Sequence, residues 1–225
     1  MTVEPSAPPL MTARSGELRF ALVLAFAVGA LLGGIAWWAD QLSWFGIPEA
    51  TPEYVAFGVL QVFGNGPTLW LIGAFVIGLA VGRIGSGMVL ATASLLLAVG
   101  VYYALIVVAD TRPGADLGPS ALAWAAVAVL SGPPMGGAGA AVAARPGRGR
   151  LVGAGLLGGA LAGIGLWLFS VPIAAVMHVV GGVAAAAWLA GPGRRIAGAA
   201  LAIVLGAVAF GLVQLTFAVV WAAIR

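Results

Sequence analysis

The sequence predicts an all-α, polytopic membrane protein, a bundle of about seven transmembrane helices with the N-terminus inside and the C-terminus outside. The first observation is composition, since hydrophobic residues make up 62% of the 225-residue chain and charged residues only 8%. A soluble domain carries about 25% charged residues, so this chain cannot cover a water-exposed surface. The second observation is a series of apolar segments of membrane-spanning length. The third is the position of the arginines between these segments.

Seven segments are apolar over roughly the 20 residues that a helix needs to cross about 30 Å of hydrocarbon. They are residues 20–39, 67–82, 88–109, 120–144, 151–169, 172–190 and 196–224. The second segment is short and the seventh is long. We therefore predict a single transmembrane domain over residues 19–225 in the cell membrane, with the lipid bilayer and other membrane proteins as its partners.

The chain that precedes the first segment differs in composition. Residues 1–18 are rich in Pro, Ser and Thr, which predicts a disordered cytoplasmic tail. The first apolar segment has full spanning length and leaves the membrane through Trp37-Trp38-Ala39-Asp40, without a small-residue cleavage site. We expect an uncleaved anchor here and not a signal peptide.

Residues 40–66 form the one long connection between predicted spans. Within it, Pro48 and Pro52 precede a semi-apolar stretch from Tyr54 to Phe63. This pattern predicts a short helix that lies at the outer interface or dips inward. Two roles stay open for it: filling space above the bundle, or covering a cavity as a lid.

The charges indicate an orientation. All ten basic residues are arginines, and an N-terminus inside places eight of them on the cytoplasmic side, as the positive-inside rule expects. These eight are Arg14, Arg19, Arg83, Arg145, Arg148, Arg150, Arg194 and Arg195. Arg112 and Arg225 fall outside. Because the arginines flank the apolar segments, the net charge of +3 is a topology signal, and we expect no nucleic-acid partner.

Small and aromatic residues predict how the helices pack and where they end. The 35 glycines include small residues four apart, such as Gly155, Gly159 and Gly163, which let helix backbones approach closely. Segment 151–169 is therefore expected at the centre of the bundle. The predicted outer ends gather tryptophans, as membrane interfaces do. They are Trp37, Trp38, Trp44, Trp70, Trp124, Trp167 and Trp221. An aromatic cage for a ligand is the alternative interpretation.

Several kinds of chemistry are excluded. The chain has no cysteine and no lysine, which removes thiolate sites and Schiff-base chemistry. One histidine cannot by itself build a metal site, and no Asp, Glu, Lys or Arg lies inside a predicted span. Ion-coupled carriers usually place a carboxylate near the midplane, and membrane prenyltransferases need acidic pairs for magnesium. We predict no catalytic residue, no metal site and no cofactor.

His178 is the single ionisable side chain at membrane depth, six residues past Pro172. At 1.5 Å per residue it lies roughly 9 Å below the outer boundary. A buried imidazole must be hydrogen-bonded or stay expensively unsatisfied. It is either a neutral link to a neighbouring helix or a group that contacts a ligand or acts as a general base.

The sequence Ser131-Gly132-Pro133-Pro134 interrupts the fourth predicted span. Two prolines remove two amide donors and free the carbonyls of Val129 and Leu130, so we expect a kink or a break near the midplane. Broken helices at this depth occur against protein or a water-filled cavity, and they mark binding sites in carriers. A plain structural kink is the alternative.

Ser131 and His178 together resemble the serine and histidine of rhomboid intramembrane proteases, which also lie two spans apart. The segment HVVGGVAA is similar to the His-x-x-Gly pattern of that family. The rhomboid Gly-x-Ser-Gly motif is not matched, because Val129-Leu130 precede Ser131, and the oxyanion-side histidine has no counterpart. Ser131 is also expected roughly 17 Å deep against 9 Å for His178.

A second resemblance covers residues 57–144. The runs FGNGPTLWLIGAFVIGLAVGR, LLLAVGVYYAL and WAAVAVLSGPPMGGAGAA resemble an uncharacterised family of small integral membrane proteins from actinobacteria. In that family Gly-Asn leads the second span, paired tyrosines end the third, and Gly-Pro breaks the fourth. The resemblance implies a topology and an actinobacterial source, and it carries no assigned activity.

Two hypotheses follow for function. The first is a non-enzymatic, transporter-like module or a membrane subunit of a larger complex, handling a neutral or lipid-like ligand. Its candidate ligand-binding residues are His178, Ser131, Gly132, Pro133 and Pro134. The second is an intramembrane serine hydrolase that uses Ser131 and His178, for which the two side chains must lie within hydrogen-bond reach.

Overall fold

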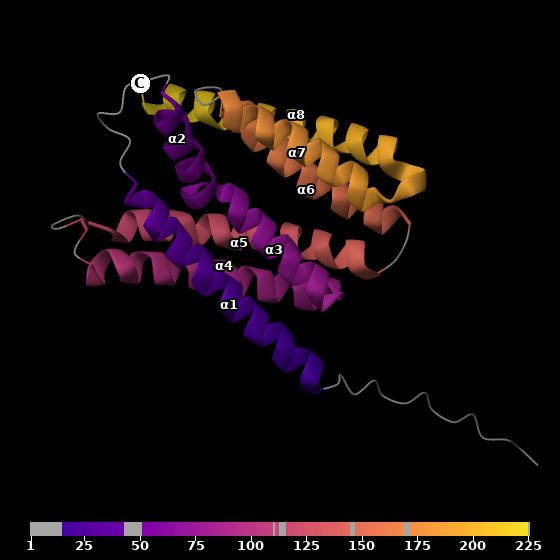
Figure 1. The fold of residues 1–225 in the computed structure, drawn as a ribbon, viewed down its shortest axis with the longest axis horizontal. Coiled ribbons are helices and arrows are strands. Elements are labelled where there is room, and N and C mark those ends of the chain that lie inside the picture. Colours follow the sequence, from indigo (N-terminus) through magenta and orange to yellow (C-terminus); the bar gives the residue numbers. More distant parts are fainter. Residues whose placement is uncertain are drawn as a thin grey trace, which may run out of the picture.

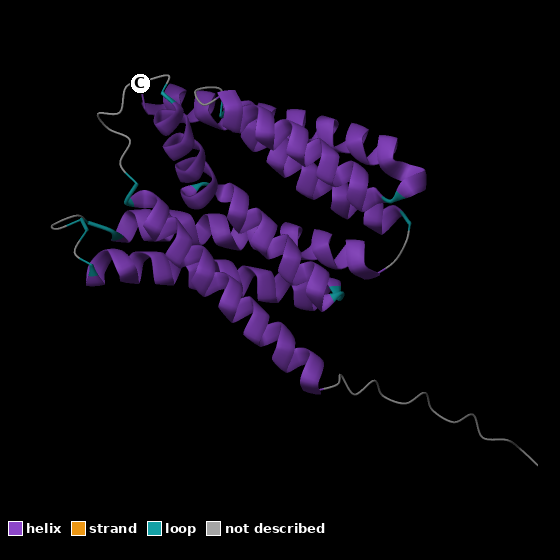
Figure 2. Ribbon diagram, in the orientation of Figure 1, coloured by secondary structure: helices purple, strands orange, loops and turns teal. Residues whose placement is uncertain are grey.

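The fold was analysed in a computed structural model that describes residues 15–42, 51–109, 111–112, 116–144, 147–168 and 172–224. Regular structure in these residues is helical throughout, which confirms the all-α prediction (Figures 1 and 2). The elements are α1 (Ser15–Asp40), α2 (Pro52–Asn65), α3 (Pro67–Val81), α4 (Ile84–Val108), α5 (Gly118–Ala144), α6 (Arg148–Trp167), α7 (Pro172–Ala190), the short 3₁₀ helix η1 (Pro192–Arg194) and α8 (Arg195–Ile224).

The predicted spans are present as helices. Six of the described helices are long and apolar enough to cross a membrane by themselves. The pair α2 and α3 passes the same test as one unit bent by 44°, which raises the number of crossings to seven. The structure therefore has six to seven candidate spans, as the sequence predicts.

The bend between α2 and α3 has a local cause. The backbone of Gly66 is extended, with φ −78° and ψ 168°, and Gly66 caps both helices. Pro67 follows at the first position of α3, where its missing N–H costs nothing, and a proline disfavours a helical residue before it. At the other end of α2, the Thr51 hydroxyl accepts a hydrogen bond from the Tyr54 N–H at 3.2 Å. The helix expected over residues 54–63 is thus real and slightly longer, whereas its place at the interface stays a prediction.

Some predictions concern residues outside the described part of the chain. These are the tail up to residue 14, the loop residues 43–50, the connection 169–171 and the arginines Arg14, Arg145 and Arg225.

The helices form two groups (Figure 1). Helices α1, α3, α4 and α5 pack together as one group, and α6, α7 and α8 pack together as the other. Helix α6 joins them through α5, and α2 reaches across to α7. The most apolar stretch of α6 is 56% buried, more than in any other candidate span, in agreement with the expected central position.

Glycines bring helix backbones together both within a group and between the two groups. A Cβ atom on Gly158 of α6 would lie 2.5 Å from the carbonyl oxygen of Gly182 in α7. A Cβ atom on Gly153 of α6 would overlap the carbonyl oxygen of Ala138 in α5. Such approaches are typical of membrane helix pairs, because lipid provides no hydrophobic force between helices.

Of the kink or break predicted in the fourth span, the break is wrong, and the kink stays a prediction. Helix α5 runs without interruption from Gly118 to Ala144, with Pro133 and Pro134 inside it. Membrane helices tolerate prolines when their neighbours compensate, and α5 packs tightly around this point. A Cβ atom on Gly132 would lie 2.5 Å from Thr92 Oγ1 of α4, and one on Gly139 would overlap the Phe75 carbonyl of α3.

The two ends of the bundle differ in charge. Successive spans run in opposite directions, so their termini gather at two ends (Figure 1). In the described part of the chain, one end, named here the arginine end, carries Arg19, Arg83, Arg148, Arg150, Arg194 and Arg195. The other, named the acidic end, carries Asp40, Glu53 and Asp116, with Arg112 as its described basic residue. The charge asymmetry used in the topology prediction thus exists in space, and which end faces the cytoplasm stays a prediction.

Candidate functional site

The buried histidine of α7 is hydrogen-bonded at both ring nitrogens. The exposed fraction of His178 is 2%, and that of Thr68, in the first turn of α3, is 1%. The Thr68 hydroxyl lies 2.5 Å from Nε2, and the carbonyl oxygen of Ala174 lies 2.6 Å from Nδ1. A carbonyl only accepts, so Nδ1 carries the proton and, in the neutral ring, Nε2 accepts from the Thr68 hydroxyl. The neutral tautomer with its proton on Nδ1 therefore has a hydrogen-bond partner at both ring nitrogens.

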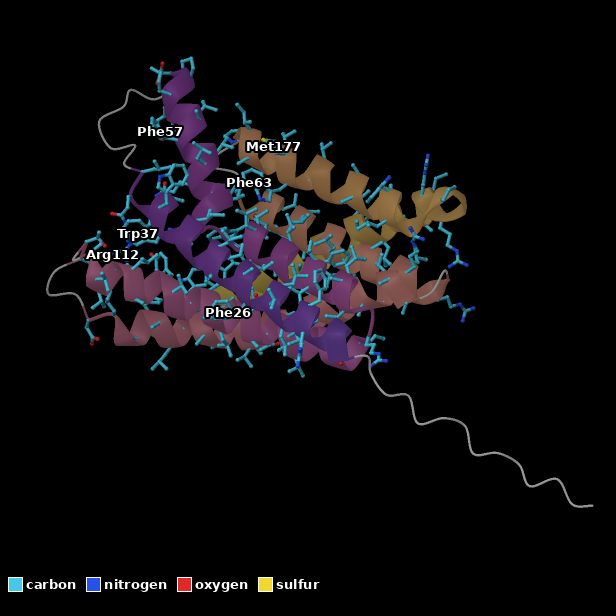
Figure 3. The ribbon with its side chains drawn as sticks, turned by 60° about the horizontal axis from the view of Figure 1, so that its bottom comes forward. Phe26, Trp37, Phe57, Phe63, Arg112 and Met177 are labelled. Carbon is cyan, nitrogen blue, oxygen red and sulfur yellow. The ribbon has the colours of Figure 1, made fainter. Side chains whose placement is uncertain are left out.

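His178 joins the two helix groups at the bend between α2 and α3. Phe63 of α2 stacks on its ring, with centroids 4.5 Å apart and planes inclined by 26°. On α6, Gly165 leaves room for the histidine, because a Cβ atom there would lie 2.9 Å from His178 Cβ. Figure 3 shows Phe63 at the lower end of α2, on the side where Met177 of α7 lies. The first turn of α3, the last turn of α2 and the middle of α7 thus meet at one imidazole.

The other candidate residues of the sequence analysis lie elsewhere. The Ser131 hydroxyl donates to the carbonyl oxygen of Val127 within α5, at 2.7 Å. Gly132 is buried against Thr92 of α4, Pro133 is half-buried and Pro134 is exposed. The structure thus brings His178 together with Thr68, and it makes no hydrogen bond between His178 and Ser131.

A polar cluster closes the acidic end of the bundle. Asp40, the last residue of α1, is 12% exposed and forms an ion pair with Arg112. The same carboxylate accepts hydrogen bonds from Asn65 Nδ2 and from the Tyr102 hydroxyl, each at 3.1 Å. Hydrogen bonds to an ionised carboxylate are stronger than those between neutral groups. The cluster therefore ties α1, α2, α4 and the segment after α4 to one carboxylate. Figure 3 shows Arg112 at this end of the bundle.

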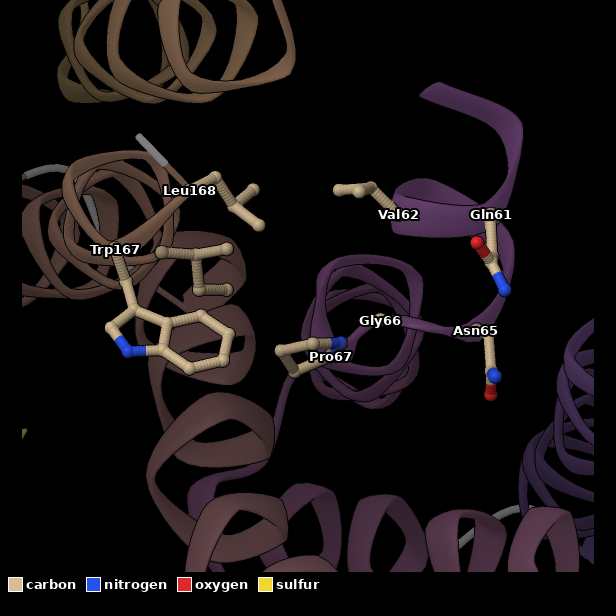
Figure 4. Close-up of a pocket in the computed structure, with 8 residues that line it drawn as sticks. Gln61, Val62, Asn65, Gly66, Pro67, Trp167 and Leu168 are labelled. Carbon is tan, nitrogen blue, oxygen red and sulfur yellow. The ribbon is translucent and has the colours of Figure 1, made fainter. Parts of the chain in front are cut away.

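A pocket of about 250 Å³ opens between the bend and the end of α6. Trp167 and Leu168 lie on one side of it and Val62 and Pro67 on the other (Figure 4). Gln61, Asn65, Gly66 and Ile164 complete the lining. Its polar side-chain groups are the uncharged amides of Gln61 and Asn65 and the indole N–H of Trp167, and no charged side chain lines it. Such a lining suits a neutral, partly apolar ligand.

The side chains that commonly bind metal ions do not cluster in the described residues. No group of three or more His, Asp or Glu side chains in this part of the chain could hold an ion.

Comparison with known sequences places the chain in a family. Residues 12–220, from before α1 to near the end of α8, match one family along their whole length. The chain belongs to DUF6518, a family of unknown function. No curated protein and no solved structure matches the chain. Membership of DUF6518 confirms the resemblance to an uncharacterised family, over a longer stretch than residues 57–144. The actinobacterial source stays a prediction.

Sequence reasoning missed several site residues of this DUF6518 member. Thr68 follows Gly66-Pro67, a helix start at which a hydroxyl usually signals only local capping. Asp40 stands at the start of the predicted loop 40–66, and its partner Arg112 lies 72 positions later. The Gly64-Asn65-Gly66 run was a visible signal for Asn65, since glycine and asparagine just before a proline predict the end of a helix there.

Proposed function

We propose that this protein is a non-enzymatic, transporter-like membrane module that binds a neutral, lipid-like ligand in the pocket between the α2–α3 bend and the end of α6. The observation that carries the proposal is the lining of this pocket. Gln61 and Asn65 supply uncharged amides, and Trp167, Leu168, Ile164 and Val62 supply apolar surface. An anionic headgroup would find no cation in the lining, and a cationic headgroup would find no carboxylate.

The size of the pocket supports an amphiphile. About 250 Å³ is slightly less than drug-sized ligands occupy, which run from roughly 300 Å³ upward. Such a pocket suits the headgroup and the first part of a chain. Trp167 is 48% exposed, so its ring forms an open rim past which the remaining chain can extend into the bilayer.

The arrangement of the two helix groups supports a transporter-like role. The pocket is lined by residues of both groups and of the α2–α3 bend. His178, which contacts Thr68 and Phe63, links the two groups beside the same bend. Toward the arginine end, Gly153 of α6 touches the backbone of α5. Carriers commonly work by rocking one bundle against the other around a site beside discontinuous helices.

The hydrolase hypothesis has weaker support. It requires Ser131 to donate to His178, yet both ring nitrogens are bonded to other groups and the serine is bonded to its own helix. A general base must lie within hydrogen-bond reach of the proton that it removes. The geometry therefore favours binding over catalysis.

Photo-crosslinking in lipid nanodiscs tests the proposal. The probe is a 1-monoacylglycerol with a diazirine on its acyl chain, and 1-monooleoylglycerol is the competitor. We expect crosslinks on α2 and the end of α6 that the competitor suppresses. Trp167→Ala should reduce them about fivefold, because it removes about 1 kcal/mol of apolar contact.

The control is Trp188→Ala, which removes a 74% exposed tryptophan from the arginine end and should leave the labelling unchanged. Crosslinks spread over the lipid-facing surfaces of all helices, insensitive to the competitor and to Trp167→Ala, would rule out the proposed site.

A further inference from the structure

Four aromatic side chains and one amide enclose a second, much smaller cavity beside the pocket. Trp70 of α3, Tyr102 and Tyr103 of α4, Trp124 of α5 and Asn65 of α2 line it. The Trp70 and Trp124 rings lie 5.7 Å apart at 41°, and the two tyrosine rings lie 5.0 Å apart at 89°. We call this set the aromatic cage. Its cavity measures about 10 Å³, room for one water-sized group.

One polar atom of the cage is buried without a partner. Trp70 is 7% exposed, and its Nε1–H has no hydrogen-bond partner among the described residues. A tryptophan N–H can only donate, and a buried donor without an acceptor costs about 1–3 kcal/mol. This donor needs an acceptor, and the small cavity that its own ring lines is the adjacent space for one.

The cage also contains two oxygen atoms that can accept a hydrogen bond. The Tyr102 hydroxyl donates to Asp40, so its oxygen keeps lone pairs for another donor. Asn65 donates to Asp40 through Nδ2, which leaves its Oδ1 as an acceptor. The Asp40–Arg112 ion pair fixes the direction of both donors.

A hydroxyl group matches this set best. It accepts from Trp70 Nε1–H and donates to Asn65 Oδ1 or to the Tyr102 oxygen. A carbonyl or ether oxygen would satisfy only the tryptophan, and an ammonium group would leave the tryptophan unpaired. The aromatic walls pack against the C–H bonds that flank such a hydroxyl.

We propose that the aromatic cage is a hydroxyl-binding subsite, which selects neutral ligands with a hydroxyl-bearing headgroup of the glycerol or sugar type. Asn65 lines both the cage and the larger pocket, so a ligand held in the pocket can place one hydroxyl in the cage. The inference rests on the proposed function and specifies its ligand class.

Two competitors that differ only at the hydroxyls test it, against the same photo-crosslinking probe. They are 1-monooleoylglycerol and its analogue with both hydroxyls methylated. The analogue cannot donate and is too large for a cavity of about 10 Å³. In the wild-type protein we expect the diol to compete about three- to tenfold better, the value of one hydrogen bond. Trp70→Phe keeps an aromatic side chain, removes the indole N–H and breaks no hydrogen bond of the described residues, and it should reduce this ratio to about one.

The control variant Trp188→Phe should keep the wild-type ratio. Equal competition by the two compounds in the wild-type protein, with the probe still in the pocket, would overturn the subsite and leave the proposed function intact. An unchanged ratio in Trp70→Phe would overturn it equally and would assign the cage to a bound water. Stronger competition by a choline-bearing lysolipid would show a cation cage in its place. If neither compound competed with the probe, the result would contradict the proposed function itself.

Discussion

Gly78→Ala is expected to destabilise the bundle by about 1–3 kcal/mol, although alanine is the better helix former. A Cβ atom on Gly78 of α3 would overlap the carbonyl oxygen of Gly136 in α5. Backbone atoms cannot turn away as a flexible side chain does, so α3 and α5 must separate. The measurement is the free energy of unfolding in mixed micelles with increasing fractions of denaturing detergent.

Gly100→Ala is the matched control, since Gly100 also lies inside a helix but its Cβ would meet nothing within 4 Å. There only the helix propensity acts, and we expect a gain of up to about 1 kcal/mol. Opposite signs for the two variants support the close contact of α3 with α5. Equal effects would contradict it.

His178→Leu is expected to cost about 2–3 kcal/mol of unfolding free energy. The substitution removes the hydrogen bond to Thr68, for which membrane proteins show about 0.6–1.7 kcal/mol, and the stacking on Phe63, worth about 0.5–1.5 kcal/mol. The Thr68 hydroxyl then stays buried without its partner. Met177→Leu is the matched control, because the neighbouring side chain is 49% exposed and should change stability little.

A double-mutant cycle with Thr68→Val isolates the hydrogen bond. If His178 and Thr68 are bonded as the structure shows, the double variant should cost about 1 kcal/mol less than the sum of the two single variants. A coupling energy of zero would mean that the two side chains do not interact. In that case the histidine would stabilise the protein only by filling space.

The order of apolar segments along the sequence was sufficient to predict most of the fold. Each long helix coincides with an apolar segment, because in a bilayer the hydrocarbon thickness dictates the length and every backbone group must be bonded within the helix. The break at Gly66 was also visible, since glycine followed by proline stops a helix locally. These features depend on neighbouring residues only.

The continuity of α5 could not be read from its prolines. Whether Pro133 and Pro134 break the helix depends on what packs around them, here Thr92, Gly87 and Phe75 of two other helices. Local chemistry gives the loss of two N–H donors, and tertiary packing decides whether the helix continues.

The site was predicted only in part, for the same reason. The sequence singled out His178 as a buried group that needs a partner, and the structure bears that out. Its partner, Thr68, lies 110 positions earlier and depends on how the two helix groups meet. The same holds for Asp40 with Tyr102 and Arg112, at separations of 62 and 72 positions.

Accessibility labelling of single cysteines tests the central claim most directly, the seven-crossing bundle with the arginine end inside. The cysteine-free chain gives no background signal. Glu53→Cys and Ser86→Cys place exposed thiols on either side of the bent α2–α3 pair. We predict that a membrane-impermeant maleimide applied to intact cells labels position 53 and reaches position 86 only after the membrane is opened. Labelling of both positions from outside, or of position 86 alone, would contradict the account.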